Sequence, residues 1–175
     1  MVIGKILRRF FVPAMVRTMI YAARYRAYVS PRAEVDFTPN LVLGRGVAIT
    51  AFVKLKATDG PMVIGPRTSI GAGCVLSTGT AGITIGADVL IAANTVIIAN
   101  NHRYDSLDKP MNQQGLRSLG VTIEDDVWLG ANTCVLDGSH IGTGTIVSAG
   151  SVVSGRVRPR QIVTGNPARA VFERR

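Results

Sequence analysis

The chain contains two histidines, and their places in the sequence differ in what chemistry they allow. His102 follows the apolar run 97–99 and begins a segment, residues 103–121, that lacks the regular pattern on either side. A neutral imidazole accepts a proton near physiological pH, so His102 is a candidate general base. Its position alone leaves a second interpretation open, that of an exposed histidine in a surface loop.

The other side chains with reactive or metal-binding groups favour structural roles. We expect His140 to be a solvated histidine at a turn, and we expect Cys74 and Cys134 to be structural thiols in a reducing compartment, since neither belongs to a CxxC pair. Two histidines cannot supply a zinc site with three histidine ligands, and no other cluster suggests a metal. The sequence therefore predicts no metal.

An aliphatic residue recurs every six positions from Leu43 onward, in short runs separated by insertions. All fifteen positions are Ile, Leu or Val: Leu43, Ile49, Leu55, Ile64, Ile70, Leu76, Ile85, Ile91, Ile97, Ile123, Leu129, Val135, Ile141, Val147 and Val153. The fifth position of thirteen of these units holds Val, Thr, Ser or Cys, and we expect it to face inward as well.

A period of six belongs neither to an α-helix nor to a simple alternating strand, but it fits a short strand followed by a turn. Three such units close into a triangular coil of 18 residues. A β-sandwich with glycine-rich turns is the alternative, but it would not keep one period over six consecutive units. The pattern therefore predicts an all-β solenoid from residue 34 to 171, interrupted by a loop at 103–121, with a basic tail at 172–175.

Charge is concentrated at the two ends of this 175-residue, single-domain chain. Residues 1–33 carry seven basic side chains and no acid, residues 34–155 have a net charge of −3, and six arginines lie beyond residue 155. A nucleic-acid-binding domain would carry its basic groups across one face, so we expect no nucleic-acid partner. Positive ends instead suit an anionic small ligand or an anionic membrane.

Residues 1–28 lack the repeat and are predicted to be helical, with a break or kink near Pro13. The longest uncharged run, 10–16, is too short to cross a bilayer, and no cleavage site of a signal peptide follows it. Two roles remain open. The segment either lies on anionic lipid as an interfacial helix or packs against the solenoid or a neighbouring subunit. We expect a cytoplasmic protein, with a peripheral contact at the inner membrane face as the open alternative.

Three stretches resemble a known family: VTIEDDVWLGAN at 121–132, SAGSVV at 148–153 and GNPAR at 165–169. With the repeat, they are similar to the hexapeptide-repeat acyltransferases, in the branch of galactoside, maltose, nodulation-factor, xenobiotic and polysaccharide O-acetyltransferases. The resemblance implies a left-handed parallel β-helix, a rare exception to right-handed crossovers. It also implies acetyl-CoA as acyl donor and a homotrimer whose active sites lie between subunits. A loop with few large apolar residues, such as 103–120, would be ordered by docking on the neighbour.

The resemblance assigns roles to particular residues. In the family a histidine at the start of this loop is the general base, and His102 precedes Trp128 by 26 residues. Small residues line the pantetheine arm of coenzyme A, and basic residues approach its phosphates. The expected donor-binding residues are Trp128, Gly130, Ala131, Ala149, Gly150, Ser154, Arg156 and Arg169. Relatives commonly have Thr-Lys-Asp at 154–156, so the arginine that contacts phosphate stays open.

The acceptor is less clearly specified. Galactoside and maltose relatives place polar side chains in the coil before the histidine, but residues 72–80 are mostly small and neutral. A lipid-linked or nucleotide-linked sugar of surface-polysaccharide synthesis fits better, with Asn94, Asn100, Tyr104 and Asp105 as acceptor contacts. The sequence thus predicts an acetyl-CoA-dependent O- or N-acetyltransferase acting on a sugar by direct transfer. A non-catalytic β-helix scaffold and an acetyltransferase of a xenobiotic acceptor are the alternatives.

Overall fold

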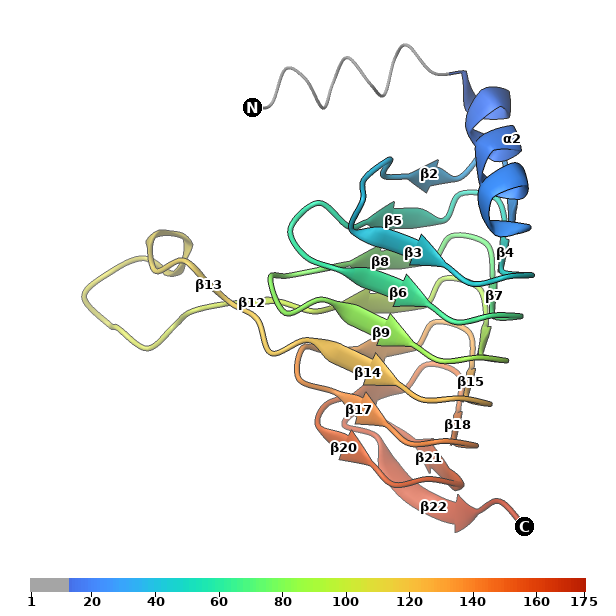
Figure 1. The fold of residues 1–175 in the computed structure, drawn as a ribbon. Coiled ribbons are helices and arrows are strands. Elements are labelled where there is room, and N and C mark those ends of the chain that lie inside the picture. Colours follow the sequence, from blue (N-terminus) through green and yellow to red (C-terminus); the bar gives the residue numbers. More distant parts are fainter. Residues whose placement is uncertain (1–12) are drawn as a thin grey trace.

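The computed structural model describes residues 13–175, which form a triangular prism of stacked coils with one helix at its N-terminal end (Figure 1). Three parallel sheets, here named A, B and C, make the three walls, and the chain visits them in that order in every coil. Followed from the N-terminus, the coils wind in a left-handed sense (Figure 1). The predicted β-helix is therefore confirmed.

The walls consist of short strands in register from coil to coil. Sheet A contains β1 (Tyr28–Val29), β4 (Ala48–Ile49), β7 (Ser69–Ile70), β10 (Leu90–Ile91), β15 (Trp128–Leu129), β18 (Ile146–Val147), β21 (Gln161–Thr164) and the antiparallel β22 (Arg169–Glu173). Sheet B contains β2 (Glu34–Val35), β5 (Lys54–Lys56), β8 (Val75–Ser77), β11 (Val96–Ile98), β16 (Cys134–Val135) and β19 (Val152–Val153). Sheet C contains β3 (Leu41–Leu43), β6 (Met62–Ile64), β9 (Ile83–Ile85), β14 (Val121–Ile123), β17 (His140–Ile141) and β20 (Arg156–Val157).

The turns between walls stack into three edges, named by the sheets that they join. The AB edge consists of residues 30–33, 50–53, 71–74, 92–95, 130–133 and 148–151. The BC edge consists of residues 36–40, 57–61, 78–82, 99–120, 136–139 and 154–155. The CA edge consists of residues 44–47, 65–68, 86–89, 124–127, 142–145 and 158–160.

The core is a stack of aliphatic layers, as the repeat predicts. All fifteen repeated aliphatic side chains are buried, none more than 3% exposed. Twelve of the thirteen small residues at the fifth position are also buried, but Thr80 is exposed. The prediction for Thr80 was wrong because the BC turn that contains it carries three extra residues. In BC turns with insertions the inward side chain is that of the second residue after the repeated aliphatic one, and it belongs to Ala57, Thr78 and Ala99.

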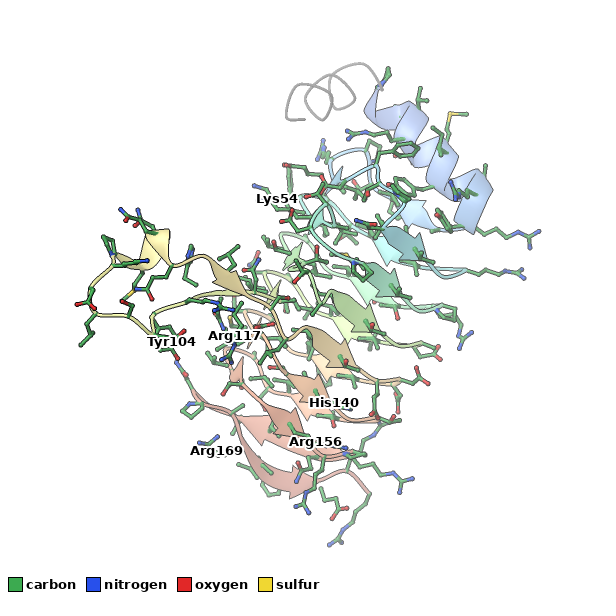
Figure 2. The ribbon with its side chains drawn as sticks, turned by 60° about the vertical axis from the view of Figure 1, so that its left-hand side comes forward. Lys54, Tyr104, Arg117, His140, Arg156 and Arg169 are labelled. Carbon is green, nitrogen blue, oxygen red and sulfur yellow. The ribbon has the colours of Figure 1, made fainter. Side chains whose placement is uncertain are left out.

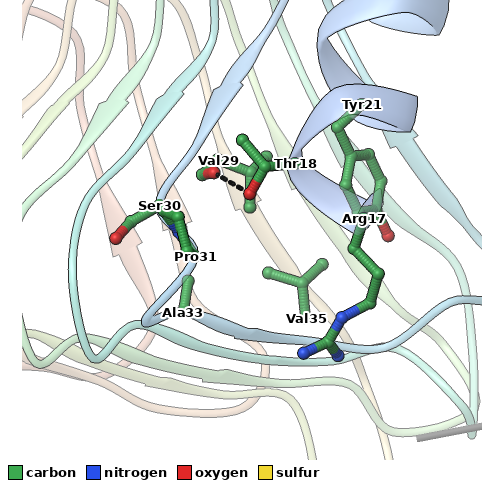
Figure 3. A pocket seen from close by; sticks show the side chains of 8 residues that line it. All are labelled: Arg17, Thr18, Tyr21, Val29, Ser30, Pro31, Ala33 and Val35. Carbon is green, nitrogen blue, oxygen red and sulfur yellow. Dashed lines mark hydrogen bonds between the residues drawn. The ribbon is translucent and has the colours of Figure 1, made fainter. Parts of the chain in front are cut away.

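The single helix, α2 (Ala14–Tyr25), starts directly after Pro13 and ends at Arg26, whose backbone is left-handed (φ 49°) and whose N–H binds the carbonyl of Ala22. Proline suits a helix start because its missing N–H would have no partner there. One side of α2 packs on the first coil. Tyr21 is 4% exposed, and the hydroxyl of Thr18 donates to the carbonyl of Val29 (Figure 3). The part of the predicted helical segment at 1–12 lies outside the described residues.

Two boundaries differ from the expected ones. The solenoid begins at β1, six residues before position 34, because Val29 and Val35 already occupy inward positions one hexad apart. The insertion at 36–40 interrupts the six-residue period, so the sequence pattern alone did not reveal this first coil. At the other end, Phe172 lies opposite Ile162 in β22, so most of the predicted tail pairs with the last coil.

Candidate active site

His102 lies at the BC edge, in a hairpin that projects from the prism (Figure 1). It belongs to β12 (Asn101–His102), which pairs in antiparallel fashion with β13 (Leu116–Arg117). The backbone N–H of Arg103 donates to the carbonyl of Gly115 and continues this ladder. The imidazole is exposed, and within residues 13–175 it has no hydrogen-bond partner. Both nitrogens are thus accessible to a substrate.

The return of the hairpin to the prism is fixed by one carboxylate. Asp137, one coil below, accepts hydrogen bonds from the backbone N–H groups of Leu119 (2.9 and 3.0 Å) and Gly120 (2.9 Å). The backbone N–H of Gly138 donates to the carbonyl of Gly120 at 2.7 Å. Charge-assisted bonds of this kind are stronger than neutral ones. They hold the base of the loop against the next coil.

Two further polar side chains order the loop. Ser118 donates to the carbonyl of Ala99 at 2.6 Å and accepts from the N–H of Ala81 at 3.1 Å, so it ties the loop to two coils. Within the loop, near the 3₁₀ turn η1 (Met111–Gln113), the Gln114 amide accepts from Ser106 N–H and donates to the carbonyls of Ser106 and Lys109. These bonds were missed by the sequence analysis, which judged how the loop is ordered from its few large apolar residues. Those residues remain exposed in a single chain: Leu107, Met111, Leu116 and Leu119.

The small residues expected to bind the donor stack at the AB edge. The Gly150 N–H donates to the carbonyl of Ala131 at 2.8 Å. A Cβ added to Gly130 would lie 2.5 Å from the backbone nitrogen of Ala149, so only glycine fits there. Gly150 has a positive φ of 72° and open space beside it, and Ala149 is exposed. The arrangement leaves a stripe of backbone free of bulky side chains, as a long amide-containing arm requires.

The remaining donor-binding candidates fall into two groups. Trp128 lies outward on sheet A, 49% exposed, between Leu90 and Ile146 of neighbouring strands. Arg169 is the first residue of β22, which also belongs to sheet A. Ser154 and Arg156 instead lie at or next to the BC edge, below the His102 hairpin. Figure 2 shows Arg156 and Arg169 toward the C-terminal end of the prism and Tyr104 on the projecting loop.

The predicted catalytic and donor residues therefore lie at two different edges of one chain. His102 is at the BC edge, while Gly130, Ala131, Ala149 and Gly150 are at the AB edge, and the whole width of sheet B separates the two. The three extended residues of β11, at about 3.3 Å each, make this width on the order of 10 Å, and His102 lies four residues further out, past Ile98. A thioester held at the AB edge of one chain is thus out of reach of its own His102.

The acceptor candidates are also divided. Asn100 precedes β12, and Tyr104 (70% exposed) and Asp105 lie in the loop, so these three are near His102. Asn94 instead forms a left-handed turn (φ 59°) at the AB edge, where its N–H binds the carbonyl of Ala72. Eight residues along a coil are enough to move a side chain to another edge. In a single chain, Asn94 lies with the donor candidates.

His140 is not the solvated turn histidine that the sequence suggested. It lies in β17, and its Nε2 is 2.7 Å from Glu124 Oε1. The other oxygen of Glu124 accepts from the N–H and the hydroxyl of Thr143, both at 2.8 Å. The bonds from His140 and Thr143 lower the pKa of Glu124 to about 2. The length of the coil, 18 residues, could have revealed this contact in the sequence. It places His140 directly beside Thr122 of the previous coil and diagonally next to Glu124.

The cysteines occupy the expected environments. Cys74 is buried and its thiol lies 3.1 Å from the carbonyl of Ala92, while Cys134 is half-buried on sheet B. Burial raises the pKa of both thiols, which disfavours the nucleophilic thiolate. Across residues 13–175, no group of three or more His, Cys, Asp or Glu side chains is placed to hold a metal ion. In the same residues, no helix has the length and apolar character needed to span a bilayer.

Comparisons with known proteins agree with this architecture. Residues 120–155 match the family described as bacterial transferase hexapeptide (six repeats), and residues 61–99 match the hexapeptide repeat of succinyl-transferase. The fold resembles that of AntD, an N-acyltransferase from Bacillus cereus solved with dTDP and 3-hydroxybutyryl-CoA. The TM-score is 0.79 at 21% identity, over 91% of this chain and 88% of that one.

Two curated relatives cover most of the chain. The probable acetyltransferase Rv3034c of Mycobacterium tuberculosis is 31% identical over 86% of this chain, which spans about half (51%) of that protein. The putative lipopolysaccharide biosynthesis O-acetyl transferase WbbJ of Escherichia coli is 30% identical, over 85% of this chain and 76% of that protein. The family resemblance drawn from the repeat and the tryptophan motif is confirmed, and the chain belongs to the hexapeptide-repeat acetyltransferases.

Proposed function

We propose that this chain transfers an acetyl group from acetyl-CoA to a hydroxyl or amine of a sugar, with His102 as the general base. The observation that carries the proposal is the exposed imidazole on a hairpin fixed by Ser118 and Asp137 at the BC edge. Relatives named as acetyltransferases, one of them of lipopolysaccharide biosynthesis, support the reaction and favour a surface polysaccharide as acceptor. A fold neighbour solved with an acyl-CoA supports the donor.

The proposed step needs no acyl-enzyme intermediate. His102 accepts the proton of the acceptor hydroxyl or amine while that atom attacks the thioester carbonyl. The C–S bond then breaks, and the imidazolium returns the proton to the departing thiolate. Because Cys74 is buried and Cys134 has a raised thiol pKa, neither is suited to hold the acyl group.

We further propose a homotrimer in which each site joins the BC edge of one subunit to the AB edge of the next. The division of the candidate residues between two edges of one chain supports this arrangement, because neither edge is sufficient alone. It also gives the exposed apolar residues of the loop a surface to pack on. We propose that the enzyme works in the cytoplasm, since free thiols such as these persist in reducing compartments.

The decisive measurement is thiol release from acetyl-CoA across a panel of sugar nucleotides, lipid-linked glycans and hydroxylated antibiotics. His102→Ala should lower turnover by about 10²-fold or more on the best acceptor, the range expected for a lost general base. His140→Ala is the matched control and should retain most of the turnover, because His140 is bound to Glu124 on sheet C. Near-normal turnover of His102→Ala would contradict the assignment, and the absence of coenzyme A binding in calorimetry would favour a non-catalytic scaffold.

A further inference from the structure

Helix α2 has two apolar sides, and within the described residues, 13–175, only one of them packs on the solenoid. The side with Tyr21, Tyr25 and Thr18 packs on the first coil. On the opposite side, Met15 is 64% exposed and Met19 is 68% exposed, and Val16, Ala22 and Ala23 are exposed as well. Side chains three, four and seven positions apart share one helix face, so these five residues form one solvent-facing apolar strip. We call it the outer face of α2.

Arginines border the outer face, and no acid accompanies them. Arg24 and Arg26 are exposed at the C-terminal end of the helix, whereas Arg17 lines the pocket between the helix and the first coil (Figure 3). Arg24 has no carboxylate partner in the described part of the chain, and its guanidinium lies 5.2 Å from the ring centre of Tyr25. The sequence has no Asp or Glu before Glu34, while it holds Lys5, Arg8 and Arg9 ahead of the helix. An apolar strip with arginines at its end is complementary to an anionic lipid surface.

The position of the helix suits such a contact. Figures 1 and 2 both show α2 at the N-terminal end of the solenoid, away from the His102 hairpin. His102 lies three coils below the first BC turn, residues 36–40, and with about 4.8 Å between strands this is roughly 14 Å along the axis. A surface in contact with α2 would leave the catalytic edge clear.

We infer that the outer face of α2 is a docking surface for an anionic bilayer. Met15, Val16 and Met19 enter the boundary between headgroups and acyl chains, while Arg24 and Arg26 contact lipid phosphates. The inference concerns where the enzyme works and does not depend on the identity of the base or of the acceptor. In the proposed trimer, three copies of α2 at one end would add their modest individual affinities through multivalency.

The test is binding of the full chain to sedimenting vesicles of phosphatidylcholine with or without phosphatidylglycerol. Binding should require phosphatidylglycerol and fall as salt is raised from about 0.1 M to 1 M, where the screening length shortens from about 10 to 3 Å. Arg24→Glu should weaken binding at least about fivefold, since each basic residue near such a surface contributes about that factor. Arg175→Glu makes the same change in net charge at the other end and should leave binding nearly unchanged.

A second matched pair of variants tests the apolar residues of the outer face. Met19→Asp removes a side chain that is 68% exposed on the outer face, and Phe172→Asp removes one that is 70% exposed at the opposite end of the solenoid. Only Met19→Asp should lower vesicle binding, with light scattering unchanged for both. Equal binding to neutral vesicles, equal effects within either pair, or a change of oligomeric state in Met19→Asp would overturn the inference. The last result would make the outer face a contact between subunits.

Discussion

The AB and BC edges are built from the same repeating coil, yet only one of them varies in length. Every AB turn has four residues, whereas BC turns range from two residues at 154–155 to the 22 residues at 99–120. The CA edge is nearly as uniform as the AB edge. All insertions into the repeat have therefore accumulated at one edge, and that edge carries His102.

The projecting hairpin differs sterically from the stacked turns. At the AB edge, glycines lie directly against the next coil, and an added Cβ at Gly71 or Gly130 would lie 2.7 or 2.5 Å from a backbone nitrogen. At the BC edge, an added Cβ at Gly60 or Gly79 would likewise lie 2.1 or 2.4 Å from a backbone carbonyl oxygen, whereas Gly115, in the projecting hairpin, has nothing within 4 Å. Backbone packed on backbone tolerates no change, while a projecting hairpin can change length freely. One edge is suited to hold a constant donor, and the other can adapt to different acceptors.

Mixing two inactive variants would test whether the two edges act in different subunits. His102→Ala removes the proposed base, and Ala149→Trp fills the exposed AB stripe with a ring, so each variant alone should be nearly inactive. In a cyclic trimer with sites between subunits, random co-assembly restores an intact pair of edges in about a quarter of the sites. Co-expressed variants should therefore recover about a quarter of wild-type turnover. Recovery no greater than the background of the parents would mean that both edges serve one chain's own site.

Paired glycine substitutions would test the steric contrast itself. Gly130→Ala places a methyl group against the backbone of Ala149, and overpacking of this kind should destabilise the fold by about 3 kcal/mol. Gly115→Ala meets no atom, and only its positive φ of 80° should cost about 1 kcal/mol. Urea unfolding of both variants measures the difference. Similar urea midpoints for the two variants would show that the coils stacked at the AB edge can move apart to accommodate the added methyl group.

Asp137 connects the variable edge to the constant coils, and it should act as a positioning residue for His102. Asp137→Ala removes the acceptor for two backbone N–H groups at the loop base, so we expect roughly a tenfold lower kcat. The KM for acetyl-CoA should change little, because the donor candidates at the AB edge are untouched. Asp108→Ala is the control, a loop carboxylate that accepts no hydrogen bond from the described residues. Equal effects of the two, or a fall confined to thermal stability, would refute the positioning role.

The two edges also differ in how far the sequence could predict them. At the AB edge the period is unbroken, so the inward place of residues such as Ile91 and Leu129 follows from counting. At the BC edge each insertion resets the count, which is why Thr80 was assigned to the interior although it is exposed. The partners of Ser118 and Asp137 lie 19 and 18 residues away, across the insertion or one coil below. Only the three-dimensional stacking of coils brings such pairs together.

The smallest expected effect concerns Glu124, at the uniform CA edge, where His140 of the next coil binds it. Its folded pKa of about 2 lies below the ordinary value of 4.5 for a glutamate, so its bonds stabilise the fold fully above pH 4.5, and this contribution is lost as the pH falls toward 2. Both side chains are about one-third exposed, so solvent screening keeps the gain small. Glu124→Gln should lower the melting temperature slightly at pH 6, and the gap from the wild type should close as the pH falls from 4.5 toward 2. A gap that widens in acid would contradict the lowered pKa, and a gap that stays constant would mean that the bonds to Thr143, rather than the charge, are what the glutamate contributes.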